Sequence, residues 1–446
     1  MLALVATTTA YHGGRLTVTH THLCRPPSCI YASASSHFDS LVRSNKVGEA
    51  VSLLLEGEEA SREQAVALLD AACSSSTTIP PPSVMEEGVA AVNAFQQKQQ
   101  DALKDVYDAL SVKGGLRGFG SVSSPALLPL SVKELSTDDQ LRLTGLPVTA
   151  FAPPQGNSPA DLLAGGVTAL ALSALSSVLD LDLRIVVGAA GVSLLTDRLV
   201  LGGAILETFT RTARPKYATT VREHEAGHFL AAYLLGCPIE ACVLDVWRAA
   251  TDGRLSGAAG TVFFDPELGR AMGDGTLTRS TIDRYSVIVM AGIAAEAAQN
   301  GKAEGGQSDE AALINLLASL DGGKSWDLPR VRNQARWGAS QALLLLREHG
   351  AAYINLCEAL KAGEGVGGCV LAIERGLDEG FGRNGELPAQ TRAREVASRA
   401  TETAAVSAAA TPAPLDVAVI DERQRQIAAR LEEIRARLER EEETWS

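Results

Sequence analysis

The stretch VREHEAGHFLAAYLL, residues 221–235, constrains the fold most, because it specifies one helix with two histidines four residues apart. Thr220 followed by Glu223 fits a capping box, in which each side chain satisfies an amide at the start of a helix. Gly236 and then Pro238 are typical of a helix end. The sequence therefore predicts a helix that begins at Thr220 and ends before Gly236.

The predicted helix brings two metal-binding side chains together. His224 and His228 differ by about 40° in direction and about 6 Å in height, so both imidazoles can bind one ion. Glu225 points to the side, where it can reach a water on that ion. In HExxH sites the ion lowers the pKa of the water, and the glutamate passes its proton to the leaving amine. This pattern favours a zinc site, and the alternative is the polar face of a surface helix.

A catalytic zinc takes three protein ligands and keeps one position open, so a third ligand must come from elsewhere. His349, in LLLLREHG, is one candidate. The other is an acid within AEGGQSDEAALINLL, residues 303–317, where Glu304, Asp309 and Glu310 precede an apolar helical run. Spacing does not choose between them.

The N-terminus and the overall charge bear on location and partners. Residues 1–38 contain no Asp or Glu and are rich in Ser, Thr and Ala, a composition typical of an organelle transit peptide or of a disordered N-terminus. The formal net charge of -13 argues against nucleic acid as a partner, because phosphate binding needs a basic surface. The seven cysteines form no CxxC pair, so we expect buried thiols in a reducing compartment.

Helical periodicity predicts a helical module over residues 39–125. Apolar residues recur at helical spacing in SREQAVALLDAAC, residues 61–73. A polar break separates them from the longer helical stretch at 84–110, VMEEGVAAVNAFQQKQQDALKDVYDAL.

A pair of apolar helices is expected over residues 160–206. LLAGGVTALALSALSSVL, residues 162–179, runs for about 18 residues without a charge, near the lower limit for crossing a bilayer. The second apolar run contains Asp197 and Arg198 near its middle. A membrane hairpin and a buried or peripheral helix pair are therefore both open.

The C-terminal part is expected to contain a low-complexity linker, 388–414, and a short coiled-coil-like helix, 415–446. Isoleucine recurs every seven residues with leucine between, at Ile420, Ile427, Leu431, Ile434 and Leu438. Self-association and docking on the same chain are equally compatible with about three heptads.

Three segments in order resemble the peptidase domain of the FtsH-type zinc metalloproteases: VREHEAGHFLAAYLLG, AGTVFF and DRYSVIVMAGIAAEAAQNGKAEGGQSDEAA. The resemblance covers roughly residues 215–350. It implies His224 and His228 as zinc ligands, Glu225 as catalytic base and Asp309 as third ligand, and it makes His349 a structural residue. It also implies a mainly α-helical peptidase domain over 207–387, with a small strand element near 258–265.

The chain departs from that family in two respects. It has neither a Walker motif nor the length for an AAA ATPase before the peptidase domain, and its AGIAAEA segment lacks the arginine of the GGRAAE pattern. The layout is similar to the ATPase-less FtsH-peptidase-like proteins of plant and algal chloroplasts. That resemblance implies a chloroplast location, with the thylakoid or the envelope as the membrane concerned.

Two residues and two functions remain to be weighed. Glu296 either orients a ligand histidine or is a solvated helix acid, and GTVFFD is either an edge strand that pairs with substrate or a core strand. The chain is then a zinc endopeptidase acting on polypeptide, alone or with a partner ATPase, or a proteolytically silent metal-binding scaffold in a membrane assembly. Homo-oligomerisation is compatible with both functions.

Overall fold

The computed structural model describes most of residues 34–380. Within that span it leaves out 57–60, 77–79, 114, 124–126, 131–133, 153–158, 201–215, 253, 256–258, 275 and 320–325. Outside it, residues 8–12, 15–19 and parts of 386–398 are described. The chain divides into two compact units, Met1–Phe381 and Gly382–Ser446. Most of the expected linker and all of the expected C-terminal heptad helix lie outside the described residues.

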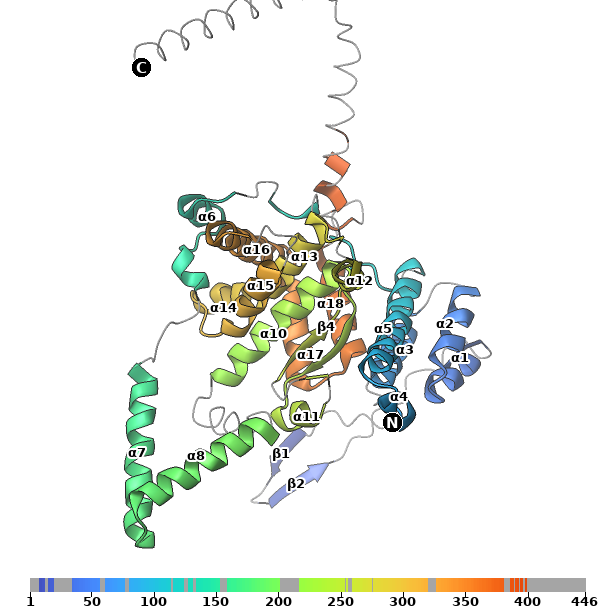
Figure 1. Ribbon diagram of the computed structural model, residues 1–446. Coiled ribbons are helices and arrows are strands. Elements are labelled where there is room, and N and C mark those ends of the chain that lie inside the picture. Colours follow the sequence, from blue (N-terminus) through green and yellow to red (C-terminus); the bar gives the residue numbers. More distant parts are fainter. Residues whose placement is uncertain are drawn as a thin grey trace, which may run out of the picture. The chain divides into compact units, whose positions relative to one another are not determined.

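The fold is mainly α-helical, as predicted, with 75% of the described residues in helices and 3% in strands. Two short antiparallel pairs of strands are present (Figure 1). One pair is β1 (Thr8–His12) with β2 (Arg15–Thr19), and the other is β3 (Ile239–Val243) with β4 (Gly260–Phe263). β4 lies within the interval predicted for a strand, and β3 carries a register shift between Ile239 and Ala241.

The predicted N-terminal helices form a group of five. They are α1 (Ala34–Arg43), α2 (Val47–Glu56), α3 (Arg62–Ser75), α4 (Pro82–Glu86) and α5 (Val89–Val112). α3 begins with a capping box between Ser61 and Gln64. Gly88, with a φ of 97°, interrupts the predicted run between α4 and α5. A positive φ is strained for other residues, so the break at a glycine follows from the sequence.

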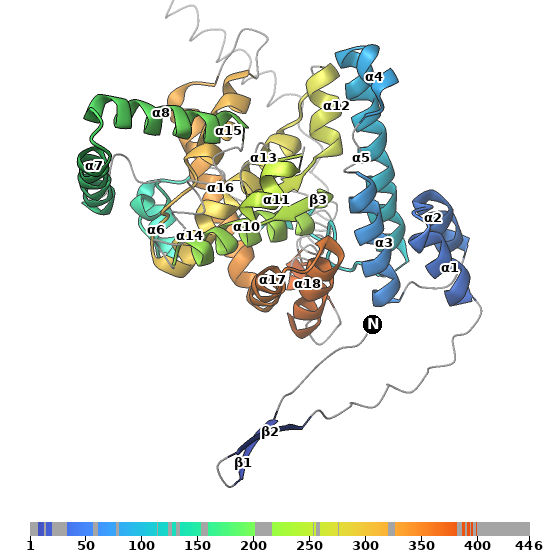
Figure 2. The same ribbon diagram turned by 90° about the horizontal axis from the view of Figure 1, so that it is seen from below.

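These five helices belong to the same compact unit as the histidine helix. Figure 2 shows α3 beside α18, and these two helices contact each other. The hydroxyl of Tyr107 on α5 donates a hydrogen bond of 3.1 Å to the Ile239 carbonyl of β3, which also accepts from the Cys73 thiol at 3.6 Å. The N-terminal helices therefore support the strand pair that lies beside the histidines.

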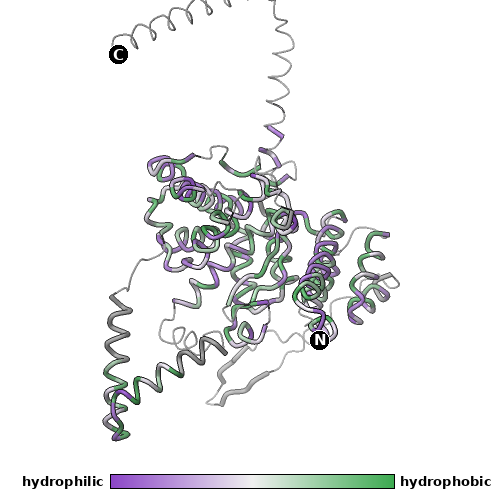
Figure 3. Tube along the Cα trace, viewed as in Figure 1, coloured by the Kyte–Doolittle hydropathy of each residue, from purple (hydrophilic) through white to green (hydrophobic). Residues whose placement is uncertain are grey.

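Two short elements and the apolar pair follow. They are α6 (Thr137–Thr144), the 3-10 helix η2 (Val148–Phe151), α7 (Pro159–Leu179) and α8 (Leu183–Val200). α7 and α8 contact each other, and Figure 3 shows hydrophilic residues gathered at the turn between them. Among the residues that the structure describes, no helix is both long enough and apolar enough to cross a membrane.

The remaining helices surround α10 (Tyr217–Leu234). They are α11 (Val246–Thr251), α12 (Pro266–Asp274), α13 (Arg279–Val289), α14 (Ala291–Asn300), α15 (Gln307–Ser319), α16 (Leu328–Glu348), α17 (Gly350–Ala362) and α18 (Val366–Gly380). α10 contacts α13, α14, α16 and α17 as well as both strands of the sheet. From residue 224 to its end, every residue of α10 is buried.

The predicted start of α10 is wrong, and its predicted end is confirmed. The helix begins at Tyr217, three residues before Thr220. The Thr220 amide and hydroxyl both bond to the Lys216 carbonyl, at 3.0 and 3.2 Å, so Thr220 continues a preceding turn and forms no capping box. At the other end Gly236 takes a φ of 78°, the left-handed conformation that stops a helix.

The described cysteines carry free thiols, as expected. Cys73, Cys237 and Cys369 are buried, and Cys242 and Cys357 are half-buried. Burial raises the pKa of the Cys73 thiol to about 12, so this thiol is neutral and packs as a small apolar group.

Candidate metal centre

The two histidines lie on the side of α10 that faces α14. α10 and α14 approach closely because Gly227 lacks a side chain: a Cβ there would lie 2.5 Å from the Ala291 carbonyl oxygen. Across the interface, a Cβ on Gly292 would lie 2.3 Å from His224 Nε2 and 2.5 Å from His228 Nε2. Glycine at position 292 therefore leaves the space that the two imidazoles occupy.

Asp309 joins the histidines from the first turn of α15. Its Oδ2 lies 2.9 Å from His224 Nε2 and 3.5 Å from His228 Nε2, and the two Nε2 atoms are 3.0 Å apart. His224, His228 and Asp309 thus form a group that could hold a metal ion.

The other candidates for third ligand lie elsewhere. His349 is buried at the junction of α16 and α17, and Glu304 and Glu310 are exposed. None of these three belongs to the group of ligand atoms that converge near the two histidines. Of the open alternatives, the structure therefore brings Asp309 to the site.

A metal ion fits the spacing of the three ligand atoms. Ligands bound at about 2.1 Å around one ion lie roughly 3.0–3.4 Å from one another for octahedral to tetrahedral angles. The three separations here, 2.9, 3.0 and 3.5 Å, lie within about 0.1 Å of that interval. The spacing accommodates a divalent ion without rearranging α10 or α15.

Hydrogen bonds on the far side of each ring fix which nitrogen is available. His224 Nδ1 lies 2.6 Å from Glu296 Oε1, and His228 Nδ1 lies 2.8 Å from the Ile288 carbonyl oxygen. Both partners are acceptors, so each Nδ1 carries the proton, and the lone pair of a neutral ring is on Nε2. The two nitrogen lone pairs and the Asp309 carboxylate then converge and repel one another. A bound cation would remove this repulsion.

Glu296 connects His224 to the turn before Asp309. Its Oε1 accepts from His224, and its Oε2 accepts from the Glu304 and Gly305 amides. It is buried, with 2% of its surface exposed. Of the two interpretations of Glu296, the geometry matches the one in which it orients a ligand histidine.

The pKa values reflect the same contacts in the absence of a metal. Burial lowers the pKa of His224, but hydrogen bonds to Asp309 and Glu296 outweigh burial and raise it to about 10. Burial raises the pKa of Asp309, but the hydrogen bonds from both histidines lower it by more, so the net shift of this pKa is downward. The carboxylates are thus ionised, and a proton competes with metal for the histidine nitrogens.

Glu225 is held by the neighbouring strand. The Thr261 amide of β4 donates to Glu225 Oε2 at 2.7 Å, and the Thr261 hydroxyl donates to the Glu225 carbonyl at 3.2 Å. The Glu225 side chain is buried and lies next to the ligand-bearing position 224. β4 therefore presents its outer edge to Glu225, because the Thr261 amide points away from the partner strand β3.

Sequence reasoning did not single out Thr261 and Gly292. Thr261 is part of the quoted GTVFFD segment, but a backbone amide leaves no signal in a sequence. Gly292 stands within AGIAAEA, and only the close approach of α14 to α10 reveals its role.

No family model, curated protein or solved structure matches this chain.

Proposed function

We propose that this protein is a zinc metalloendopeptidase that cleaves polypeptides at the site formed by His224, His228, Asp309 and Glu225. The observation that carries the proposal is the convergence of three metal-ligand atoms beside a buried glutamate held by a strand edge. The resemblance of the HEAGH region to FtsH-type peptidases supports zinc as the metal and polypeptide as the substrate.

The residues have distinct roles in this proposal. His224 Nε2, His228 Nε2 and Asp309 Oδ2 hold the ion, and Glu296 keeps His224 in the tautomer that presents Nε2. When bound, zinc supplies Lewis-acid activation of water and of the peptide carbonyl. Glu225 accepts the proton of the attacking water and transfers it to the leaving nitrogen, so the amide bond breaks and an acid and an amine are released.

The strand β4 supplies a means of holding substrate. Its outer edge faces Glu225 through the Thr261 amide. Because Glu225 already occupies the Thr261 amide, an extended peptide would add to this edge beyond Thr261 and so lie beside the proposed base, as in strand-addition complexes. In this proposal the substrates are accessible polypeptides or polypeptides delivered by a partner ATPase. A chloroplast location is part of the same proposal and rests on the N-terminal composition and the resemblance.

The test is casein cleavage by the zinc-loaded full chain and by the variant Glu225→Gln. The full chain is used because α3 and α5 pack against α18 and β3. We expect cleavage by the wild-type chain and a loss of about 10²–10⁴-fold in the variant, the usual contribution of a general base. Glu223→Gln, the same change two residues earlier on α10, is the matched control and should keep activity.

Metal content separates the peptidase from the scaffold. Both variants should retain one zinc per chain by plasma mass spectrometry, since neither residue is a proposed ligand. Zinc bound by all three proteins with no cleavage by any of them would contradict the peptidase and support the metal-binding scaffold.

A further inference from the structure

A cavity of about 490 Å³ lies along α10 on the side that carries Glu225. Its walls come from the first turns of α10, the end of β3, α11 and the loop between α17 and α18. The basic residues in its lining are Arg222, Arg248 and Lys361. The proposed chemistry uses none of them.

Helix geometry places this cavity next to the proposed base. Each residue of an α-helix advances by about 100° and 1.5 Å, so Arg222 lies about 60° and 4.5 Å from Glu225, and Ala218 about 20° and 10.5 Å. The cavity wall also includes Cys242, which pairs in register with Thr261, the residue whose amide holds Glu225. The cavity thus flanks Glu225, whereas the metal ligands occupy the side of α10 that faces α14.

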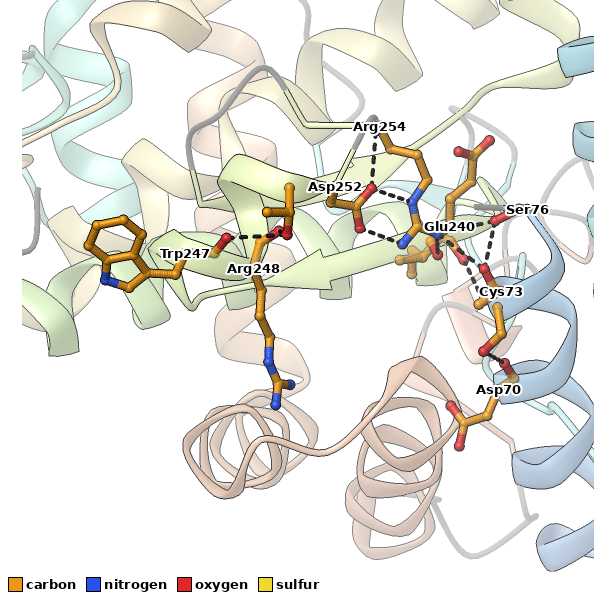
Figure 4. Close-up of polar contacts among 11 residues, drawn as sticks. Asp70, Cys73, Ser76, Glu240, Trp247, Arg248, Asp252 and Arg254 are labelled. Carbon is orange, nitrogen blue, oxygen red and sulfur yellow. Dashed lines mark hydrogen bonds and ion pairs between the residues drawn. The ribbon is translucent and has the colours of Figure 1, made fainter. Parts of the chain in front are cut away.

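The two arginines in the wall have no acceptor among the described residues. The Arg222 Nε atom is buried without a hydrogen-bond partner there. Figure 4 shows the Arg248 side chain extending from α11 toward α17 and α18; the residue is exposed, and no ion pair among the described residues involves it. A buried guanidinium nitrogen without an acceptor is costly, so Arg222 favours an anionic ligand here, and the exposed Arg248 leaves its guanidinium available to the same ligand.

Two of the three acids in the lining are committed to local contacts. Asp252 faces Arg254, whose Nε and Nη2 lie 3.0 and 2.7 Å from its two oxygens (Figure 4). Asp245 accepts from the Arg248 amide at 2.8 Å and caps α11. Glu364, the third acid, is exposed to solvent and has no such partner among the described residues.

Lys361 is the weaker of the basic contacts. It pairs with Glu358 at 3.2 Å, but both side chains are more than half exposed, so this pair holds the lysine loosely. Arg222 and Arg248 are therefore the residues that discriminate, because a guanidinium binds a carboxylate through two parallel hydrogen bonds.

We propose that this cavity, lined by Arg222 and Arg248, is a substrate subsite that binds a carboxylate of the polypeptide near the scissile bond. This inference rests on the proposed peptidase function. At about 3.3 Å per residue of an extended peptide, the helical offsets of 4.5–10.5 Å correspond to roughly one to three residues from the cleaved bond. The carboxylate is either that of an Asp or Glu side chain or the C-terminus of the substrate.

The experiment measures peptide binding and peptide cleavage separately. Fluorescein-labelled peptides carry Glu or its neutral isostere Gln at each of six positions in turn. Binding is measured by anisotropy to the zinc-loaded full chain with Glu225→Gln, and cleavage with the wild-type chain. At one position we expect the Glu peptide to bind about tenfold more tightly than the Gln peptide. Peptides with a free or an amidated C-terminus distinguish the second source of the carboxylate.

Variants of the cavity test the assignment. Arg248→Gln and Arg222→Gln should each reduce the preference, and Arg248→Glu should reverse it, so that the Gln peptide binds more tightly than the Glu peptide. Arg270→Gln, an exposed arginine on α12, is the matched control and should keep the preference. Melting temperatures close to wild type verify that each variant is folded.

The outcomes distinguish the subsite from the peptidase. Equal binding of Glu and Gln peptides at every position, with either C-terminus, would overturn the subsite even if casein is cleaved. A preference that survives both Arg222→Gln and Arg248→Gln would also overturn it. A preference that these variants remove supports the subsite, and in a chain without cleavage it would leave the subsite standing while the peptidase fails.

Discussion

α10 and α7 are both helices with long apolar segments, but their surroundings are opposite. Phe229 and Leu230 of α10 are fully buried, whereas Leu170 and Val178 of α7 are 72% and 81% exposed. α10 is enclosed because other helices and the strand pair contact it, and because glycine lets α14 approach closely. Apolar composition therefore does not determine burial in this chain; the presence of neighbouring elements does.

Polar residues sharpen the difference between the two helices. His224, Glu225 and His228 are buried in α10, and each of them has a hydrogen-bond partner on another element. The charged and polar residues of the α7–α8 turn are exposed. Buried side chains with hydrogen-bond partners hold a metal site in a fixed geometry. We therefore expect substitutions around the histidines of α10 to have large effects and substitutions in α7 to have small ones.

The largest expected effect is on the core around α10. Phe229→Ala removes a fully buried aromatic ring and should lower the free energy of unfolding by about 3–5 kcal/mol. Urea unfolding followed by circular dichroism measures this change. A loss below about 1 kcal/mol would contradict the enclosed position of α10.

Removal of the third ligand comes next. Structural zinc sites bind with about 10–16 kcal/mol over four ligands, so Asp309→Ala should weaken zinc binding by roughly 10²–10³-fold. Competition with a chromophoric chelator measures the affinity. Glu310→Ala, an exposed acid on the same helical turn, is the control and should leave the affinity within about twofold of wild type.

Glu296 should have a smaller effect, because it contacts the metal only through His224. Glu296→Gln keeps the shape but weakens the acceptor for His224 Nδ1 and for the loop amides. Zinc affinity should fall by about 10–100-fold, as for other residues that orient metal ligands. The same chelator competition applies, and an unchanged affinity would assign Glu296 to packing alone.

The smallest effect is expected on α7. Val178→Ser changes an apolar side chain that is 81% exposed, and the free energy of unfolding should shift by no more than about 0.5 kcal/mol. A loss comparable with that of Phe229→Ala would show that α7 is covered in solution, and the contrast between the two helices would fail.

Much of the site could be predicted from the sequence because its first part is local. Four-residue spacing on one helix determines that His224 and His228 share a side, whatever the rest of the chain does. Asp309 is 85 residues from His224, so spacing left it open beside His349, and only the resemblance favoured it. The contact of Glu296 with His224 likewise depends on how α14 packs, which no short pattern encodes.

The rest could not be predicted because tertiary contacts determined it. Thr220 and Glu223 have the spacing of a capping box. The residues just before them are already helical, however, so the helix does not begin at Thr220 and no capping box forms. The arginines of the cavity come from α10 and α11, 26 residues apart in the sequence, and only tertiary packing brings them to one wall. Short-range patterns thus predicted that the two histidines of α10 lie together, but not Gly292, Thr261 or the arginines around them.

The most direct test of the metal centre is anomalous diffraction at the zinc edge from crystals of the zinc-loaded full chain. We expect one strong peak about 2.0–2.2 Å from His224 Nε2, His228 Nε2 and Asp309 Oδ2, the usual zinc–ligand distances. A peak bound by cysteines or by His349, or no peak between α10 and α15 in zinc-saturated crystals, would contradict this expectation.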